Sequence, residues 1–398
     1  MNDEFSTIRP FNDDEVRGAI ESLLNDRQFS RILKGVLPIL PLGMSRGMLK
    51  LATLGIKSTL GFQIRFMKPI VNHVLRKCST GHTFQHDTIV AGKERYTFLS
   101  NHRDIVLDSA ILDVMLFDAK FPTTCEIAIG DNLLIYPWIK TLVRLNKAFI
   151  VRRNISRREL FDSSMLMSRY MHHAINEKHE NIWIAQREGR AKDSSDQTQV
   201  SLLKMLAMSD AEHPLERIRS LNIVPLAISY EYDPCDYLKA KEFQQKRDDA
   251  AWKKSKQDDL INMKTGIFGQ KGHVHYQTGR PVNTWIDEIV SSVRLRNGGE
   301  QELKDLDKVE FFNELARRID REIHHNYRLF PGNYVAADLL SGKPTHATRY
   351  SHKEKVAFEK YLKERIALID LPNKDEAFLR ERLLTMYANP LLNYEATL

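Results

Sequence analysis

Short segments rich in β-forming residues alternate with helical stretches from about residue 90 of this chain, and this alternation restricts the fold more than any other feature of the sequence. The β-like segments are residues 96–100, 125–129, 148–152, 181–185, 223–230 and 273–276. Helical stretches, such as residues 108–117 and 158–176, separate most of them. Strands that alternate with helices form a mainly parallel sheet covered by helices. The sequence therefore predicts an α/β fold, with a mainly parallel or mixed sheet flanked by helices.

Helical additions are expected on both sides of this sheet. Residues 11–26 are predicted to form a short helix that starts with a capping box, in which Asn12 is followed by Glu15. From about residue 286 the chain is polar and its apolar residues recur at helical spacing, as at Phe311 and Leu315. We therefore expect three regions, a helical one over residues 1–85, an α/β domain over 86–285 and a helical one over 286–398.

The segment from residue 31 to residue 80 is basic and amphipathic. It contains nine Lys or Arg residues and no Asp or Glu, in a chain of net charge +7. One side of a predicted helix comprises Met48, Leu51, Leu54 and residues 56–62. An anionic bilayer attracts such a segment by about 1 kcal/mol per cation near the headgroups. We therefore predict that residues 1–85 dock the protein on an anionic membrane surface. The alternative is a helical pair that packs into the core and exposes a solvated basic face.

Two other classes of protein are disfavoured. No apolar run reaches the ~20 residues that a membrane-spanning helix needs, and the polar, acidic first residues differ from a secretory signal. Cys78, Cys125 and Cys235 are too few for a disulfide framework and have no Cys-x-x-Cys spacing. The sequence therefore predicts a protein of a reducing compartment, bound peripherally to the cytoplasmic face of a membrane, without a metal site.

A histidine lies between the predicted strand 96–100 and the predicted helix 108–117. Ligands of α/β folds bind at the ends of strands, so His102 is a candidate general base. A carboxylate would fix the tautomer of its imidazole, and both Asp108 and Asp104 are available. Because a six-residue offset turns ~240° on a straight helix, Asp108 can partner His102 only if the histidine precedes the helix. The alternative is a histidine that caps the helix or binds loop carbonyls.

Charged residues also follow two other predicted strands. Arg152 and Arg153 end the strand at 148–152, and the strand at 181–185 is followed by Glu188, Gly189 and Arg190. Guanidinium groups suit phosphate oxygens, and glycine allows the backbone to approach a ligand closely. The two arginines belong to a basic strip that comprises Lys140, Arg144, Lys147, Arg152, Arg153, Arg157 and Arg158. The strip favours a phosphate-bearing ligand, and the alternatives are a solvated helix face or a nucleic-acid patch.

Four segments, taken in order, resemble the sequence blocks of the glycerolipid acyltransferase superfamily, which includes the glycerol-3-phosphate and lysophosphatidic acid acyltransferases. They are Asn101-His102 with Asp108, Phe149-Ile150-Val151-Arg152, Glu188-Gly189-Arg190, and Val224-Pro225. The resemblance covers roughly residues 90–285. Two spacings differ from the family, because five residues rather than four separate His102 from Asp108, and none rather than one separates Gly189 from Arg190.

The resemblance implies that residues 86–285 form an acyltransferase domain. His102 is expected to take a proton from an acceptor hydroxyl, whose oxygen attacks the thioester carbonyl of an acyl-CoA or an acyl carrier protein. Asp108 is expected to orient His102, with Asp104 in reserve. The residues expected to bind the acceptor, a glycerol phosphate or a lysophospholipid, are Arg152, Arg153, Glu188, Gly189 and Arg190. No cofactor and no metal is required, because a thioester is already activated.

The protein is therefore predicted to be a membrane-associated O-acyltransferase of phospholipid synthesis. Because the Glu188 block departs from the family pattern, a lyso-amino-acid lipid is an alternative acceptor. A non-catalytic basic protein that binds a membrane or a nucleic acid is a second alternative. It explains the charge but not the order of the four blocks, so we expect no nucleic-acid partner.

Overall fold

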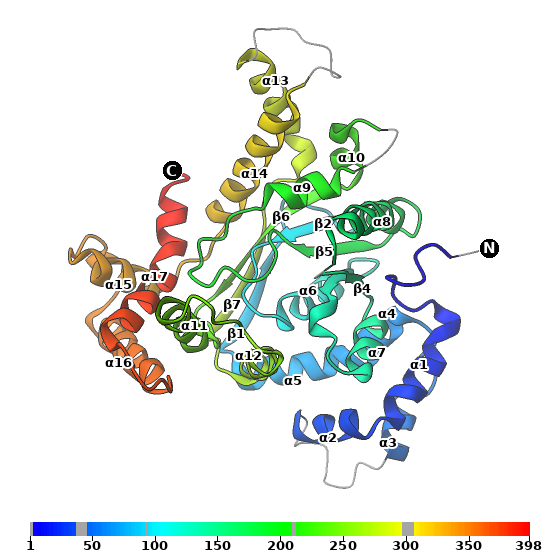
Figure 1. The fold of residues 1–398 in the computed structure, drawn as a ribbon, viewed down its shortest axis with the longest axis horizontal. Coiled ribbons are helices and arrows are strands. Elements are labelled where there is room, and N and C mark those ends of the chain that lie inside the picture. The colour runs from blue at the N-terminus through cyan, green and yellow to red at the C-terminus, as the bar shows by residue number, and fades with distance from the viewer. Residues whose placement is uncertain (1–2, 37–45, 93, 154, 209–211, 297–305) are drawn as a thin grey trace.

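A computed structural model describes residues 3–36, 46–92, 94–153, 155–208, 212–296 and 306–398 of the chain (Figure 1). Seven strands in these residues form one sheet in the order β1-β7-β6-β2-β5-β3-β4. They are β1 (Gly81–Gln85), β2 (Thr97–Ser100), β3 (Cys125–Gly130), β4 (Ala148–Val151), β5 (Asn181–Ala185), β6 (Ile223–Tyr230) and β7 (His273–Thr278). Only the pairing of β6 with β7 is antiparallel among these strands. The prediction of a mainly parallel or mixed sheet flanked by helices is confirmed.

Helices cover both faces of the sheet, and further helices precede the first strand and follow the last strand in the chain. In the first half of the chain they are α1 (Asp13–Asn25), α2 (Arg27–Val36), α3 (Arg46–Ala52), α4 (Thr59–Phe62), a π-helical turn (Gln63–Met67), α5 (Lys68–Cys78), α6 (Leu107–Asp118), α7 (Pro137–Leu145) and α8 (Arg157–Asn176). In the second half they are α9 (Val200–Leu206), α10 (Pro214–Ser220), α11 (Asp236–Asp248), α12 (Lys256–Phe268), α13 (Ile286–Arg296), α14 (Lys308–His325), α15 (Pro331–Ser341), α16 (His352–Ala367) and α17 (Glu376–Glu395).

Successive side chains of the strands point to opposite faces of the sheet and supply two separate cores. In β5, Ile182 and Ile184 pack on one face with residues of α8, α9 and α14. Trp183, between them, packs on the other face with residues of α5 and α6. Both faces of the central strands are therefore buried, as is usual for strands of a parallel sheet.

Pro225 lies in β6, a central strand between β7 and β2. A proline inside a strand usually marks an edge or a bulge, because it has no N–H to donate. The Pro225 carbonyl accepts a hydrogen bond from Gly279 N, just beyond the last paired residue of β7, Thr278. Its nitrogen faces the same side, where the β7 ladder has already ended. The Gly279 carbonyl oxygen, which a residue with an N–H could have bound, accepts a hydrogen bond from Thr88 Oγ1 at 2.8 Å.

The N-terminal helices form a small core of their own. Asn12 and Glu15 make the predicted capping box at the start of α1. The apolar stripe of α1, including Ile20, packs against Phe62 of α4 and Leu145 of α7. These contacts attach α1 to the edge of the sheet that ends with β4.

The basic segment is not one helix, so the prediction that residues 48–62 share one helical side is wrong. Helix α3 ends at Ala52, Gly55 follows with a left-handed φ of +79°, and the Ser58 side chain caps α4. Glycine adopts this conformation without strain, so the chain reverses there. Ile56 becomes buried, whereas Leu51 and Leu54 are exposed.

Helix α5 and strand β1 belong to the main fold rather than to a separate surface region. Val71, Val74 and Leu75 of α5 pack in the core beneath α6, as the alternative of core-packing helices expects. Strand β1 pairs with β7, so the helical assignment of residues 1–85 is wrong for Gly81–Gln85. No helix in the described part of the chain combines the length and apolarity that a membrane span requires.

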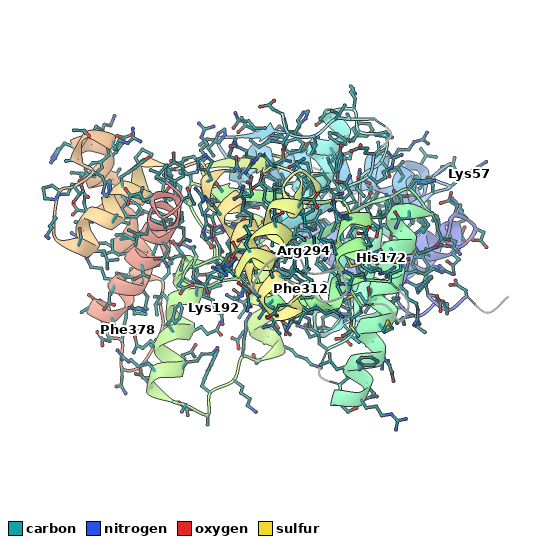
Figure 2. All side chains as sticks on the ribbon, turned by 90° about the horizontal axis from the view of Figure 1, so that it is seen from above. Lys57, His172, Lys192, Arg294, Phe312 and Phe378 are labelled. Atoms are coloured by element: carbon teal, nitrogen blue, oxygen red, sulfur yellow. The ribbon has the colours of Figure 1, made fainter. Side chains whose placement is uncertain are left out.

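The C-terminal helices α15, α16 and α17 pack together at one end of the molecule, opposite the N-terminal helices (Figure 2). Their core includes Val335, Leu362 and Leu383, and Ala240 of α11 joins it. Helices α11 and α12 correspond to the charged stretch of the sequence between β6 and β7. The C-terminal region is helical, as predicted.

His172 of α8 is buried, and its two ring nitrogens face a carbonyl and a hydroxyl. Its Nε2 lies 3.1 Å from the Leu206 carbonyl oxygen, and its Nδ1 lies 3.0 Å from Ser220 Oγ. Burial, reinforced by the nearby Arg217 charge, lowers the pKa of His172 to about 4. The folded protein therefore holds this imidazole neutral at pH values where the unfolded chain would protonate it.

We expect His172 to make the protein sensitive to mild acid. Since the folded-state pKa lies below the unfolded value of about 6.5, the contribution of His172 to stability is complete above that value and is lost as the pH falls toward 4. Between pH 7 and 4 the free energy of unfolding should fall by roughly 3 kcal/mol more in the wild type than in His172→Gln. Urea denaturation at several pH values measures this, with the exposed His352→Gln as the control. Parallel wild-type and His172→Gln profiles would contradict the prediction.

Candidate active site

The candidate residues come together because they follow parallel strands. Strand β5 pairs with β2 on one side and β3 on the other, and β3 pairs with β4, all in parallel. Parallel strands end at the same edge of a sheet, where α/β folds place their ligands. The loop with His102 after β2, Arg152 and Arg153 after β4, and residues 186–192 after β5 therefore lie at one edge.

His102 is held by Asp108. The Nδ1 atom of His102 lies 2.8 Å from Asp108 Oδ2, and the same oxygen accepts hydrogen bonds from Arg103 N at 2.6 Å and Asp104 N at 3.0 Å. His102 lies in the loop that precedes α6, and Asp108 lies in the first turn of α6. The loop bends back over the helix start, so the helical phase does not separate the pair.

Asp104 has a different role, so its place in reserve as the partner of His102 is wrong. Its Oδ1 accepts hydrogen bonds from Val106 N and Leu107 N, both at 2.8 Å. The carboxyl thus binds the free backbone donors at the start of α6. Burial, together with the nearby Asp108 charge, raises the pKa of Asp104 above its usual value.

A buried network fixes the residues on either side of His102. Asn101 Nδ2 donates to the Ile228 carbonyl at 2.9 Å, and Ile228 N donates to Asn101 Oδ1 at 2.8 Å. Arg103 forms an ion pair with Asp196 at 2.6 Å, and Tyr327 OH donates to the same carboxylate at 2.6 Å. Tyr327 follows α14, so the C-terminal region supports the loop that carries His102.

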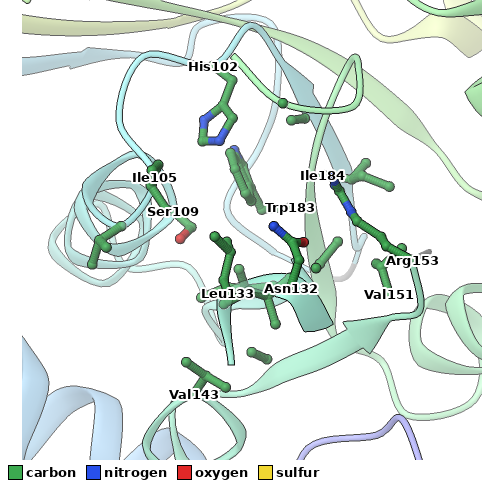
Figure 3. Close-up of a pocket in the computed structure, with 18 of the residues that line it drawn as sticks. His102, Ile105, Ser109, Asn132, Leu133, Val143, Val151, Arg153, Trp183 and Ile184 are labelled. Carbon is green, nitrogen blue, oxygen red and sulfur yellow. The ribbon is translucent and has the colours of Figure 1, made fainter. Parts of the chain in front are cut away.

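The His102 ring lies on the wall of a large cavity of about 1740 Å³ (Figure 3). Trp183 packs edge-to-face against it, with ring centroids 5.5 Å apart. The other predicted site residues also line the cavity, namely Arg152, Arg153, Glu188, Gly189 and Arg190. Asp108 lies behind His102 and is fully buried. The cavity continues between helices whose walls are apolar, including Phe66 of the π-helical turn and Trp138 of α7.

The charged residues after β4 and β5 contact one another across the cavity edge. Arg153 Nη1 lies 2.9 Å from Glu188 Oε1, and Arg153 N donates to Asp131 Oδ1. Gly189 has a φ of +72°, which turns the chain sharply after Glu188. Arg190 Nη2 donates to Asn262 Oδ1 of α12 at 2.8 Å. Arg152 is exposed and lines the cavity.

The basic strip between Lys140 and Arg158 does not form one ligand-binding surface. Lys147 is buried and forms an ion pair with Glu180 at 2.7 Å. Arg144 donates to the carbonyls of Arg9 and Ser6 and stacks on Phe11. Of the strip side chains that the structure describes, Arg152 and Arg153 line the cavity. Packing of the N-terminal segment against α7 removes Arg144 from the site.

Sequence reasoning missed part of the cavity wall. Arg187 and Lys192, beside the Glu188 block, line the cavity, as do Lys264 and Met263 of α12. The sequence places Arg187 and Lys192 in the charged loop after a predicted strand, but they are not among the residues expected to bind the acceptor. No local signal places α12 there, because its packing on the His102 loop depends on the tertiary fold.

Gly266 allows α12 to approach that loop. A Cβ atom at this position would lie 2.0 Å from Asp104 Oδ2, and the Asp104 carboxyl is held by two backbone donors. A contact this short requires α12 or the loop to move, and overpacking of this kind costs about 1–3 kcal/mol.

We therefore expect Gly266→Ala to lower the free energy of unfolding by about 1–3 kcal/mol, measured by urea denaturation. Gly18→Ala is the matched control, because it also lies in a helix but a Cβ there meets no atom within 4 Å. The free energy of unfolding of this control should rise by about 0.5–1 kcal/mol, because alanine has a higher helix propensity than glycine. Equal stability of Gly266→Ala and the wild type would show that the space between α12 and Asp104 can accommodate a Cβ atom at this position.

The candidate active site lies in the part of the chain that matches a known protein family. Residues 77–229 match the family model described as Acyltransferase, and they include His102, Asp108, Arg152, Glu188 and Pro225. A search of curated protein sequences found no match. Among solved structures, the chain is similar to the 1-acyl-sn-glycerophosphate (LPA) acyltransferase PlsC from Thermotoga maritima, with 10% identity, a TM-score of 0.35, and 79% of this chain and 99% of that chain covered. The matched residues contain the four ordered blocks, so this part of the chain forms a domain of the Acyltransferase family.

Proposed function

We propose that the protein is a peripheral membrane O-acyltransferase that moves a fatty acyl group from an acyl-CoA or an acyl carrier protein to a hydroxyl of a glycerol phosphate or lysophospholipid. The observation that carries this proposal is the His102 imidazole, oriented by Asp108 at 2.8 Å, on the wall of a cavity that has a cationic side and an apolar side. The match to the Acyltransferase family model supports acyl transfer, and the lining of the cavity supports the choice of substrates.

In the proposed reaction His102 acts as the general base. Its Nδ1 faces Asp108, so the neutral ring has Nε2 free to accept the proton of the acceptor hydroxyl. The hydroxyl oxygen attacks the thioester carbonyl, and the tetrahedral intermediate collapses by breaking the carbon–sulfur bond. The proton passes from His102 to the departing thiolate. The products are an ester and a free thiol, and Asp108 stabilises the imidazolium formed between the two steps.

The charged side of the cavity suits a substrate with phosphate groups. The cations that line it are Arg152, Arg153, Arg187, Arg190, Lys192, Lys204, Lys254 and Lys264. The acids that line it are Glu188 and Asp259, and these are paired with Arg153 and Lys254 respectively. The excess of positive charge attracts anionic ligands into the cavity. In the proposal, Arg152 binds the acceptor phosphate and Glu188 a neighbouring hydroxyl.

The apolar side of the cavity suits the acyl chain. Its walls come from the π-helical turn, α5 and α7, with side chains such as Ile70 and Leu142. Burying a chain there gains about 0.8 kcal/mol per CH₂ group. The thioester carbonyl would then lie where the apolar wall meets the charged wall, beside His102.

We expect His102→Ala to lower kcat/KM for acyl transfer by about 10²–10⁴-fold, because the general base is lost. Asp108→Asn should also lower it, since the neutral amide cannot stabilise the imidazolium of His102 as the carboxylate does. The assay follows a labelled acyl group from acyl-CoA or acyl carrier protein to glycerol-3-phosphate, lysophosphatidate or a lyso-amino-acid lipid. His352→Ala, on the surface of α16, is the matched control and should retain full activity. Wild-type rates in His102→Ala would exclude His102 as the base.

We expect Arg152→Ala to act on phosphate-bearing acceptors specifically. Loss of a charge-assisted hydrogen bond of about 1.5–3 kcal/mol should lower kcat/KM for glycerol-3-phosphate by roughly 10–100-fold, mainly through KM. Transfer to glycerol, which has no phosphate, should change little. Arg317→Ala on α14 is the control, because it is exposed and lies outside the cavity. An equal loss with both acceptors would mean that Arg152 does not bind phosphate.

A further inference from the structure

Two helical ends project from the same side of the molecule beside the cavity. Figure 1 shows α8, α11 and α12 nearly end-on, and Figure 2, turned by 90°, shows the end of α8 and the α11–α12 pair extending beyond the rest of the fold on one side. Both α8 and α12 contribute side chains to the cavity wall. Side chains on both projections therefore form part of the cavity wall.

The first turns of α8 expose large apolar side chains beside cations. Leu160 is 50% exposed and Phe161 is 59% exposed, although both line the cavity. Arg152 and Arg158 precede them and are also exposed. The intervening Glu159 is engaged in the capping box with Ser156. This end of α8 thus combines apolar and positively charged groups.

The α11–α12 pair repeats this combination. Its turn carries Trp252 and two exposed lysines, Lys253 and Lys256, the last at the start of α12. Along α12, Ile261 is 41% exposed and Phe268 is 40% exposed. Large apolar side chains in water are costly unless another surface covers them, and the neighbouring cations indicate that this surface is anionic.

We propose that the start of α8 (residues 158–161) and the α11–α12 pair (residues 252–268) form the surface by which the protein sits on an anionic bilayer, with the mouth of the His102 cavity facing the lipid. We call this the portal surface. The inference rests on the proposed function and names where its membrane contact lies. Aromatic and aliphatic groups enter the interface while lysine and arginine contact headgroups. A lysophospholipid could then pass from the bilayer into the apolar side of the cavity without its chain crossing water.

The portal surface differs from the N-terminal segment predicted from the sequence. In that segment Ile56 and Phe62 are buried, and Leu51 and Leu54 remain exposed. Lys57 lies away from the projecting helical ends in Figure 2. Leu160, Phe161 and Phe268 of the portal surface line the cavity, whereas Leu51 and Leu54 do not.

Sedimentation with lipid vesicles tests the location of the contact. We expect Phe161→Ser combined with Ile261→Ser to weaken binding to phosphatidylcholine vesicles containing phosphatidylglycerol by at least about tenfold, from the apolar burial lost. Val356→Ser combined with Leu368→Ser, on or beside α16, removes exposed apolar groups elsewhere and should bind as the wild type does. If Leu51→Ser combined with Leu54→Ser abolishes binding while the portal variant binds normally, the proposal is overturned.

A charge variant separates this inference from the proposed function. Arg158→Gln, Lys253→Gln and Lys256→Gln together should weaken binding to the phosphatidylglycerol vesicles by at least about tenfold and leave binding to pure phosphatidylcholine unchanged. These residues do not line the cavity, so transfer from octanoyl-CoA to glycerol-3-phosphate in solution should stay within about twofold of the wild type. Unchanged vesicle binding with weaker binding of an acidic acyl carrier protein would overturn the proposal and assign the surface to that donor. If the wild type itself transfers no acyl group to any of the acceptors tested, the proposed function is refuted instead.

Discussion

The His102 loop depends on a single carboxylate oxygen. Asp108 Oδ2 accepts from the imidazole and from two successive backbone N–H groups, so one atom fixes both the ring and the loop that carries it. The carboxylate is buried in the first turn of α6, where the helix dipole favours negative charge. The extra residue between His102 and Asp108 is absorbed in this turn. A longer spacing than the family pattern is therefore compatible with a close pair.

Residues far from the matched domain hold this arrangement in place. Tyr327, after α14, donates to Asp196, which is paired with Arg103 next to His102. On the opposite side, α12 approaches Asp104 closely because Gly266 has no side chain. The C-terminal region and α12 thus support the site. A substitution in either element that moves these buried polar contacts would also displace the loop that carries His102, because such contacts tolerate displacement poorly.

The cavity joins the two environments that the proposed acyl transfer to a phosphate-bearing acceptor requires. Parallel strands deliver the charged loops to one edge of the sheet, and the N-terminal helices add apolar walls beyond that edge. The helices that the sequence assigned to a separate docking region are therefore partly walls of the cavity. This gives the N-terminal region a structural reason for its apolar content, independent of any membrane contact.

Much of the fold was decided by local sequence. The β-forming residues of β5, the capping box at Asn12 and the order of the four blocks predicted a strand, a helix and an acyltransferase domain correctly, because these are properties of neighbouring residues. The sequence also indicated which strand ends carry polar groups. Only the tertiary structure decided that Asp108 rather than Asp104 contacts His102, that Lys147 of the basic strip is paired and buried, and that α12 closes over the site. Those outcomes depend on which distant segments pack within hydrogen-bonding distance, and spacing along the chain does not specify that.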